Sequence, residues 1–191
     1  MVLKWLSQQE TSARTLANQS DLRQYVETLV KNHRKPNALS SDPLGDAKVL
    51  EEIEQEIAPT LANYEFSGYM ISDAKHQILA SNHRELIGRS YEEYEAFLAR
   101  VFDNKSSVSP PFASRVAIAD THGKMHTGLP TMFVSVPILD QDLQIIAALS
   151  LRIRPEREFT RLIQKHSIPV FPGFWPRQCA FLECIKTSLL L

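Results

Sequence analysis

The residues most able to do chemistry in this sequence are an aspartate and two histidines that lie close together in the chain. Asp120, His122 and His126 supply a carboxylate and two imidazoles, the groups that bind zinc and similar metal ions. The residues around them are typical of a turn, where exposed polar side chains are expected. Because the spacing is loose for a metal site, we interpret the cluster as solvated loop residues and expect no metal.

Short catalytic and nucleotide-binding motifs are absent from the sequence. It contains no G-x-S-x-G, no P-loop, no H-E-x-x-H and no G-x-G-x-x-G pattern. The acidic residues between positions 51 and 56 have helical spacing and indicate a solvated helix face. We therefore expect neither enzyme activity nor a cofactor, and a hydrolase or lyase with an unrecognised site is kept as an alternative.

Five polar residues fall where a purely structural core would be apolar, and they are the candidates for a ligand site. Arg115 opens an expected strand, and its guanidinium could hold a carboxylate with two parallel hydrogen bonds. Ser135 lies in the middle of another expected strand, and the site would be walled by Tyr69, Tyr91 and Tyr94. The alternative is an exposed cation at a strand end and core tyrosines with their hydroxyls at the surface. The predicted partner is a small molecule whose identity the sequence leaves open, with carboxylates and amino acids as candidates.

The elements that must position these residues change from helical to strand-like near residue 67. Apolar periodicity predicts one long helix or two helices over residues 2–33, and another over 47–58 that Pro59 ends or bends. Later helices are expected over 90–102, with Ser90 and Glu93 as a capping box, and over 156–164. Strands are expected over 68–72, 77–81, 114–119, 132–139 and 144–153.

Five strands with one helix between the second and the third predict an α+β fold with a PAS-like, five-stranded antiparallel sheet. Helices then cover the sheet, with a long helical element at the N-terminus. We expect three regions, which are an N-terminal helical region over 1–66, the sheet domain over 67–165, and an atypical tail over 166–191.

Composition excludes several classes of protein. The 191 residues include 21 basic and 22 acidic ones, so the charge balance gives no indication of nucleic-acid binding. No run of about eighteen apolar residues predicts a membrane span, and the N-terminus does not have the pattern of a signal peptide, so the chain alone would be cytoplasmic. Cys179 and Cys184 have no partner pair for a zinc site, and a disulfide between them is left open.

Two segments resemble bacterial extracytoplasmic Cache sensor domains, which are PAS-like. Residues 68–90, GYMISDAKHQILASNHRELIGRS, resemble the first strands and the "IGR" element of that family. Residues 131–163, TMFVSVPILDQDLQIIAALSLRIRPEREFTRLI, resemble its later strands and closing helix, and residues 2–33 look like its long N-terminal helix. The resemblance covers residues 2–165 and is to the membrane-distal half of a double Cache domain.

The resemblance implies a small-molecule-sensing input domain of a transmembrane signalling protein, extracytoplasmic in the parent receptor. A homodimer through the N-terminal helix is a separate expectation. The amino-acid-binding signature of some Cache domains is not recognisable, so that ligand class is not carried over. The tail over 166–191 departs from the family and is either a truncated or frame-disrupted end or a genuine extension. The alternative function is a structural or dimerisation module with no ligand.

Overall fold

The computed structural model of the chain describes residues 2–34, 43–120 and 122–154. The expected closing helix over 156–164, the tail over 166–191 and both cysteines lie outside these described residues. The chain divides into two compact units. The first unit contains the described residues up to Ser109 together with Phe133–Ile153, and the second contains those of Pro110–Met132 together with Arg154. The three-region division expected from the sequence stays a prediction.

Three helices form one layer of the first unit. The N-terminal segment folds as two helices, α1 (Val2–Ala17) and α2 (Ser20–Arg34), and α3 (Pro43–Asn63) continues through Pro59. Their apolar stripes are fully covered, because the side chains that recur at helical spacing are at most 1% exposed, namely Leu16, Leu22, Val26, Leu29, Ile53 and Ile57. None of the described helices is long and apolar enough to span a bilayer.

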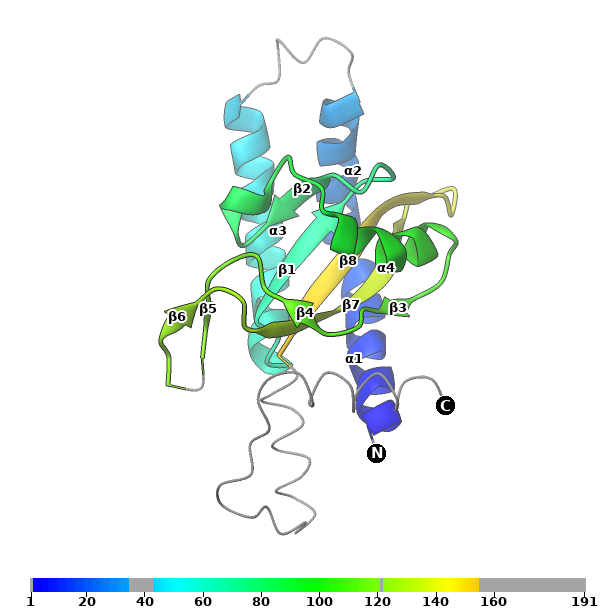
Figure 1. The fold of residues 1–191 in the computed structure, drawn as a ribbon. Helices are drawn as coiled ribbons and strands as arrows, with labels where there is room; N and C mark the ends of the chain where they lie inside the picture. The colour runs from blue at the N-terminus through cyan, green and yellow to red at the C-terminus, as the bar shows by residue number, and fades with distance from the viewer. Residues whose placement is uncertain (1, 35–42, 121, 155–191) are drawn as a thin grey trace, which may run out of the picture. The chain divides into compact units, whose positions relative to one another are not determined.

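A sheet forms the next layer, with five strands in the order β2-β1-β8-β7-β3 and a sixth, short strand that pairs with β7 off this path (Figure 1). The strands are β1 (Gly68–Ser72), β2 (Ile78–Ser81), β3 (Ser107–Val108), β7 (Pro130–Leu139) and β8 (Ile145–Ile153). Antiparallel pairing joins β1 to both β2 and β8, and joins β3 to β7. The central place of β8 explains its nearly continuous apolar sequence. The predicted α+β, PAS-like fold is confirmed.

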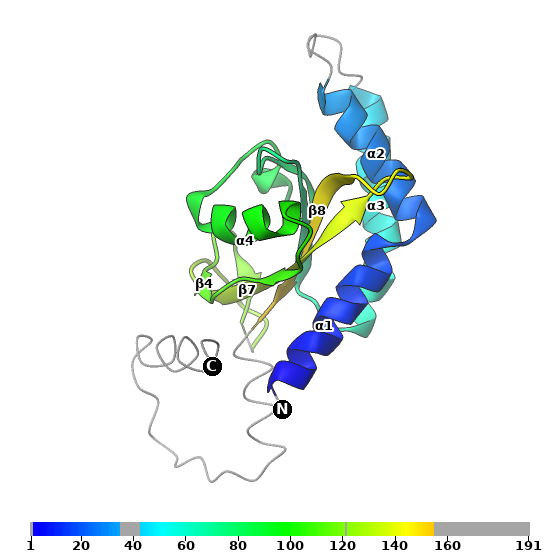
Figure 2. The same cartoon turned by 90° about the vertical axis from the view of Figure 1, so that its right-hand side faces the viewer.

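The two faces of this sheet meet different helices. Figure 2 shows α4 (Glu92–Phe102) on one side of the sheet and α1, α2 and α3 on the other. Cross-strand partners point to the same face, so the pairs Gly68↔Arg152 and Met70↔Ser150 share one face, and Tyr69↔Leu151 lies on the opposite one. The face of Arg152 is the α4 face, because its guanidinium lies over the Phe133 ring, which also contacts Tyr94 of α4.

Two expectations about local structure are wrong. The third strand of this sheet in chain order is β3, whose Ser107 and Val108 pair with β7. The sequence had predicted residues 114–119 for this strand. A strand of two residues inside a polar loop has no alternation of its own, so long-range pairing alone defines it. The expected capping box at Ser90 is also wrong, because the N-cap is Tyr91 in extended backbone with no side-chain cap. The acidic first turn of α4 interacts favourably with the helix dipole instead.

The second unit contains short strands. Here β4 (Phe112–Ala113) pairs with the first residues of β7, and β5 (Ile118–Ala119) pairs with β6 (Met125–His126). The residues expected as a strand over 114–119 therefore form a bend followed by β5.

Three hairpin turns, two in the first unit and one in the second, are built by the same device. In each turn an aspartate Oδ1 accepts the backbone N–H groups two and four residues later, at 2.8–2.9 Å, and these aspartates are Asp73, Asp120 and Asp140. The fourth residue of each turn has left-handed backbone, with φ of 61° at His76, 82° at Gly123 and 61° at Leu143. These aspartates have a structural role that their sequence positions already explain.

Candidate functional site

The most unusual side chain of the first unit is Arg152, near the end of the central strand β8. It is 2% exposed, and its guanidinium carbon lies 5.3 Å from the centroid of the Phe133 ring. Neither its Nε nor its Nη1 has a hydrogen-bond partner. Burying a charged group without hydrogen bonds is costly, so these two donors indicate an anion that would complete the site.

Aromatic rings of α4 pack against Phe133, the ring over which this guanidinium lies. Tyr94 and Phe97 lie three residues apart on the helix, so both project toward the sheet. Their ring centroids lie 5.7 Å and 5.9 Å from that of Phe133. Tyr91, half-buried at the N-cap, has its ring centroid 5.2 Å from that of Tyr94. The aromatic side chains of α4 thus pack on one face of the sheet.

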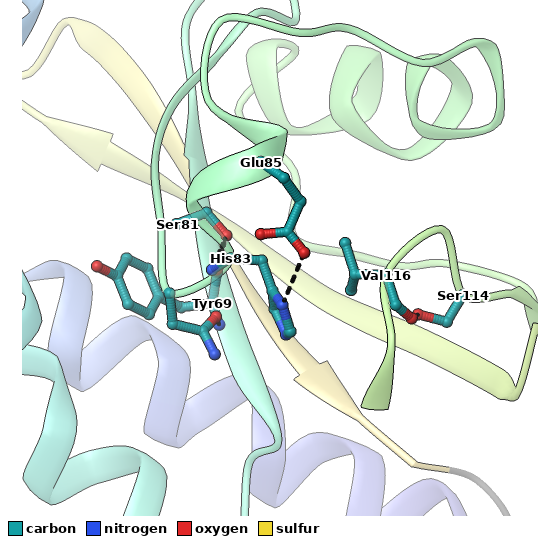
Figure 3. Close-up of polar contacts among 7 residues, drawn as sticks. Tyr69, Ser81, His83, Glu85, Ser114 and Val116 are labelled. Atoms are coloured by element: carbon teal, nitrogen blue, oxygen red, sulfur yellow. Dashed lines mark hydrogen bonds and ion pairs between the residues drawn. The ribbon is translucent and has the colours of Figure 1, made fainter. Parts of the chain in front are cut away.

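His83 lies just after β2, at the start of η2 (Arg84–Leu86), and is fixed by its own backbone. Its N–H donates to Ser81 Oγ at 3.1 Å, and that hydroxyl donates to the Tyr69 carbonyl at 2.9 Å. Its Nδ1 lies 3.5 Å from Glu85 Oε1 (Figure 3), and the Glu85 side chain is 60% exposed. These contacts hold the imidazole at the end of β2.

The electrostatics couple His83 to Arg152. Burial lowers the pKa of His83, the positive charge of Arg152 lowers it further, and Glu85 opposes the shift. Burial also lowers the pKa of Arg152, against the effects of Tyr94 and Glu85, although a guanidinium stays charged in proteins. The site therefore has one fixed positive charge, and a histidine whose neutral form is favoured until an anion binds nearby.

A row of serines continues the α4 face of the sheet beside Arg152. Ser135 of β7 is fully buried, and its Oγ lies 2.8 Å from Ser150 Oγ of β8. Ser107 of β3 is the cross-strand partner of Ser135, and its buried Oγ has no hydrogen-bond partner. Ser135, which the sequence predicted as a ligand-binding residue, thus lies on the same face as Arg152.

Tyr69 lies on the other face of the sheet. Burial raises the pKa of its phenol, and the charge of Glu54 on α3 raises it further. Figure 3 shows the Tyr69 ring and the His83 ring on opposite sides of the strand between them. The Tyr69 N–H donates to Asn82 Oδ1 at 2.9 Å. The structure therefore does not bring Tyr69 together with Tyr94.

Arg115 is exposed and lies in the second unit, in a bend between β4 and β5. The bend is closed by Ser114, whose Oγ donates to the Val116 carbonyl at 2.8 Å (Figure 3). Of the five residues predicted from the sequence, the structure thus places Tyr94 and Ser135 on the Arg152 face and Tyr91 at its rim. The ligand-binding roles of all five residues stay predictions.

In the Asp120 cluster one imidazole lies against the carboxylate. His126 Nε2 lies 3.1 Å from Asp120 Oδ2, and the other carboxylate oxygen accepts the backbone N–H groups of His122 and Lys124. The hydrogen bond from the Lys124 N–H is the main reason that the pKa of Asp120 is lowered. Among residues 2–34, 43–120 and 122–154, no group of three or more His, Cys, Asp or Glu side chains could hold a metal ion.

Sequence reasoning missed Arg152 and His83. Arg152 lies at the end of a strand that the apolar pattern predicted to be central, and a charge in such a strand should have been noticed. Ser150 and Arg152 are two residues apart, so both point to one face of a buried strand. His83 has no such signal, because it follows β2 in an irregular segment.

Comparison with known proteins identifies the fold. No protein-family model matches the sequence, and neither does any curated protein. The sensor domain of DcuS from E. coli is similar in structure, with a TM-score of 0.56 and 13% identity over 83% of this chain and 95% of that one. The first unit therefore has the fold of a Cache-type sensor domain, as the resemblance implied.

Two further solved structures are similar at lower TM-scores. The sensor domain of the V. cholerae histidine kinase DctB gives 0.42 at 11% identity, over 78% of this chain and 56% of that one. The ligand-binding domain of the Campylobacter jejuni chemoreceptor Tlp3, in complex with 4-methylisoleucine, gives 0.45 at 14% identity, over 85% and 63%. The chain thus spans less than two thirds of either of these two structures.

Proposed function

We propose that this chain is a small-molecule-sensing input domain that binds a carboxylate at Arg152 and performs no catalysis. The observation that carries the proposal is the buried guanidinium, whose Nε and Nη1 have no hydrogen-bond partner. The planar fork of an arginine matches the two oxygens of a carboxylate, and charge-assisted bonds of this kind are among the strongest in proteins. A carboxylate would thus remove the cost of two unsatisfied buried donors.

The residues around Arg152 support this assignment. Phe133 contacts the guanidinium by a cation–π interaction, and Tyr94 and Phe97 of α4 pack against the Phe133 ring. His83 could gain a proton when an anion arrives, since an opposite charge nearby raises the pKa of an imidazole. The sensor-domain fold shared with DcuS is consistent with ligand binding.

The route from ligand to output would pass through β8. Arg152 points to the α4 face of this strand, while α1 and α2 also contact β8. A ligand that shifts β8 would therefore shift the N-terminal helices, which is the change that a receptor needs. An extracytoplasmic location in a parent receptor and a homodimer through α1 and α2 belong to the same proposal, and light scattering at increasing protein concentration tests the dimer.

Thermal unfolding with short carboxylates tests the proposal. A ligand at 100 times its Kd stabilises the folded state by about 2.7 kcal/mol. For a chain of this size that energy raises Tm by about 5–11 °C. We expect such a shift for the unaltered protein and for Arg115→Gln, and its loss in Arg152→Gln.

Arg115→Gln is the matched control, because it removes the arginine that the sequence alone favoured. A shift that is lost in Arg115→Gln and kept in Arg152→Gln would move the site to the second unit. No shift with any carboxylate would favour the alternative of a structural module without a ligand.

A further inference from the structure

The serine row beside Arg152 has more hydrogen-bonding capacity than the protein uses. Ser107, Ser135 and Ser150 are at most 3% exposed and lie on neighbouring strands of the α4 face. Each of the three hydroxyls must be satisfied to offset its desolvation, as must the other buried polar side chains of the sheet strands, Ser72, Ser81, Thr131 and Arg152.

Counting donors and acceptors shows what is left over. A hydroxyl has one proton and two lone pairs, and the bond between Ser135 and Ser150 uses one proton and one lone pair. One proton and three lone pairs of this pair remain, and the Ser107 Oγ has no partner at all. The row can therefore both donate to and accept from a neutral group, such as a hydroxyl or a carbonyl.

The row lies within reach of a ligand held at Arg152. Ser150 precedes Arg152 by two residues on β8, and Phe133, which lies under the guanidinium, precedes Ser135 by two residues on β7. Two residues of a strand span about 6.6–6.8 Å. A short carboxylate of three to five carbons can thus place its acid group at the guanidinium and its far end at the hydroxyls.

The charges near the row argue against an ammonium group. No aspartate or glutamate is buried among the residues that the structure describes. Glu85, whose charge acts on both Arg152 and His83, is 60% exposed and already pairs with His83. A buried cation without a carboxylate partner would carry a large desolvation cost, and Arg152 would repel it.

We propose that Ser107, Ser135 and Ser150 form a neutral hydrogen-bonding subsite that determines specificity, so that the ligand is a short hydroxy- or oxo-carboxylate rather than an amino acid. This inference rests on the proposed function, since it assumes that a carboxylate occupies Arg152. It adds the chemical identity of the far end of the ligand, which the guanidinium alone does not determine.

A matched series of probes tests the subsite by calorimetric titration. Butanoate, 4-hydroxybutanoate and 4-aminobutanoate differ only in their terminal group, and the three- and five-carbon equivalents vary the length. The best-fitting hydroxy acid is expected to bind about three- to tenfold more tightly than its alkyl partner, as for one added hydrogen bond. The amino acid of the same length is expected to bind more weakly than both.

Variants then locate the preference. Ser135→Ala and Ser150→Ala are expected to bring the ratio of hydroxy to alkyl affinity close to one, while Ser12→Ala, a buried serine of the opposite layer, keeps it. Ser135→Cys serves if the alanine variant does not fold. An unchanged ratio in the serine variants, or equal binding of the amino acid, overturns the subsite.

The two proposals fail in different ways. Equal affinity for butanoate and 4-hydroxybutanoate, with both lost in Arg152→Gln, refutes the subsite and leaves the carboxylate site standing. Absence of binding by every member of the series refutes both.

Discussion

Replacing Arg152 by methionine should make the ligand-free protein more stable. Methionine keeps the unbranched aliphatic stem of the arginine and removes the guanidinium, whose Nε and Nη1 have no partners. Most large changes in a core destabilise a protein, so a gain here would be a distinctive result. Residues selected for binding rather than for stability are where such gains are found.

The magnitude follows from the contacts of the guanidinium. Each unsatisfied buried donor costs about 1–3 kcal/mol, so the two together cost about 2–6 kcal/mol. The cation–π contact with Phe133 returns about 0.5–2 kcal/mol. The difference agrees with the gain of about 1–4 kcal/mol when a buried ionic group is replaced by a well-packed apolar one. Each kcal/mol raises Tm by about 2–4 °C in a chain of this size.

Urea unfolding without ligand, followed by circular dichroism, measures this change. Ser81→Ala is the matched control, because its hydroxyl is equally buried and makes two hydrogen bonds, to the Tyr69 carbonyl and from the His83 N–H. The free energy of unfolding of Ser81→Ala should be lower than that of the unaltered protein by about 1–3 kcal/mol. If Arg152→Met loses stability as Ser81→Ala does, then the guanidinium is satisfied in the folded protein and our reasoning about the anion is refuted.

Three further predictions concern pH and backbone. The ligand-free protein should lose stability as pH falls from 7.5 to 5.5. Burial lowers the pKa of His83 below its ordinary value of 6.5. The contribution of neutral His83 to the free energy of unfolding is therefore complete above pH 6.5 and is lost as pH falls through the folded-state pKa. In His83→Gln, Tm should change less with pH. Leu143→Gly should raise the free energy of unfolding by about 0.5–1 kcal/mol, because Leu143 has a φ of 61°, which glycine adopts without strain. Gln141→Gly in the same turn should not raise it, and urea unfolding measures both variants. Gly68→Ala should lower the free energy of unfolding by about 1–3 kcal/mol, since the Cβ of the alanine would lie 2.7 Å from Asn82 Oδ1. An unchanged Tm would contradict this prediction.

The parts of the fold that local patterns determine were predictable. Alternating or continuous apolar runs bounded by turn residues gave β1, β2, β7 and β8 nearly at their observed limits. The short strand β3 was not predictable, because Ser107 and Val108 are a strand only through their pairing with β7. The break between α1 and α2 was left open by the sequence, since Asn18 and Gln19 neither require nor forbid a continuous helix.

The candidate site was predictable only in part, for a related reason. Tyr94 and Ser135 were chosen because each is a polar residue in an apolar element, and the structure places both on the Arg152 face, while their role in binding stays a prediction. Arg152 itself was overlooked in a strand whose apolar character dominated the pattern. Which face a strand residue occupies depends on sheet pairing, and that is why Tyr69 could not be separated from the others by sequence alone.

The central claim is that Arg152 binds a carboxylate, and the Nε–H signals of arginines in a ¹H–¹⁵N spectrum test it most directly. The Arg152→Lys variant lacks one of these signals and thereby assigns it. We predict that titration with the tightest-binding member of the butanoate series shifts that signal strongly, because its donor acquires a charged acceptor. A signal that stays in place while other resonances move would show that ligands bind elsewhere, and would contradict the account.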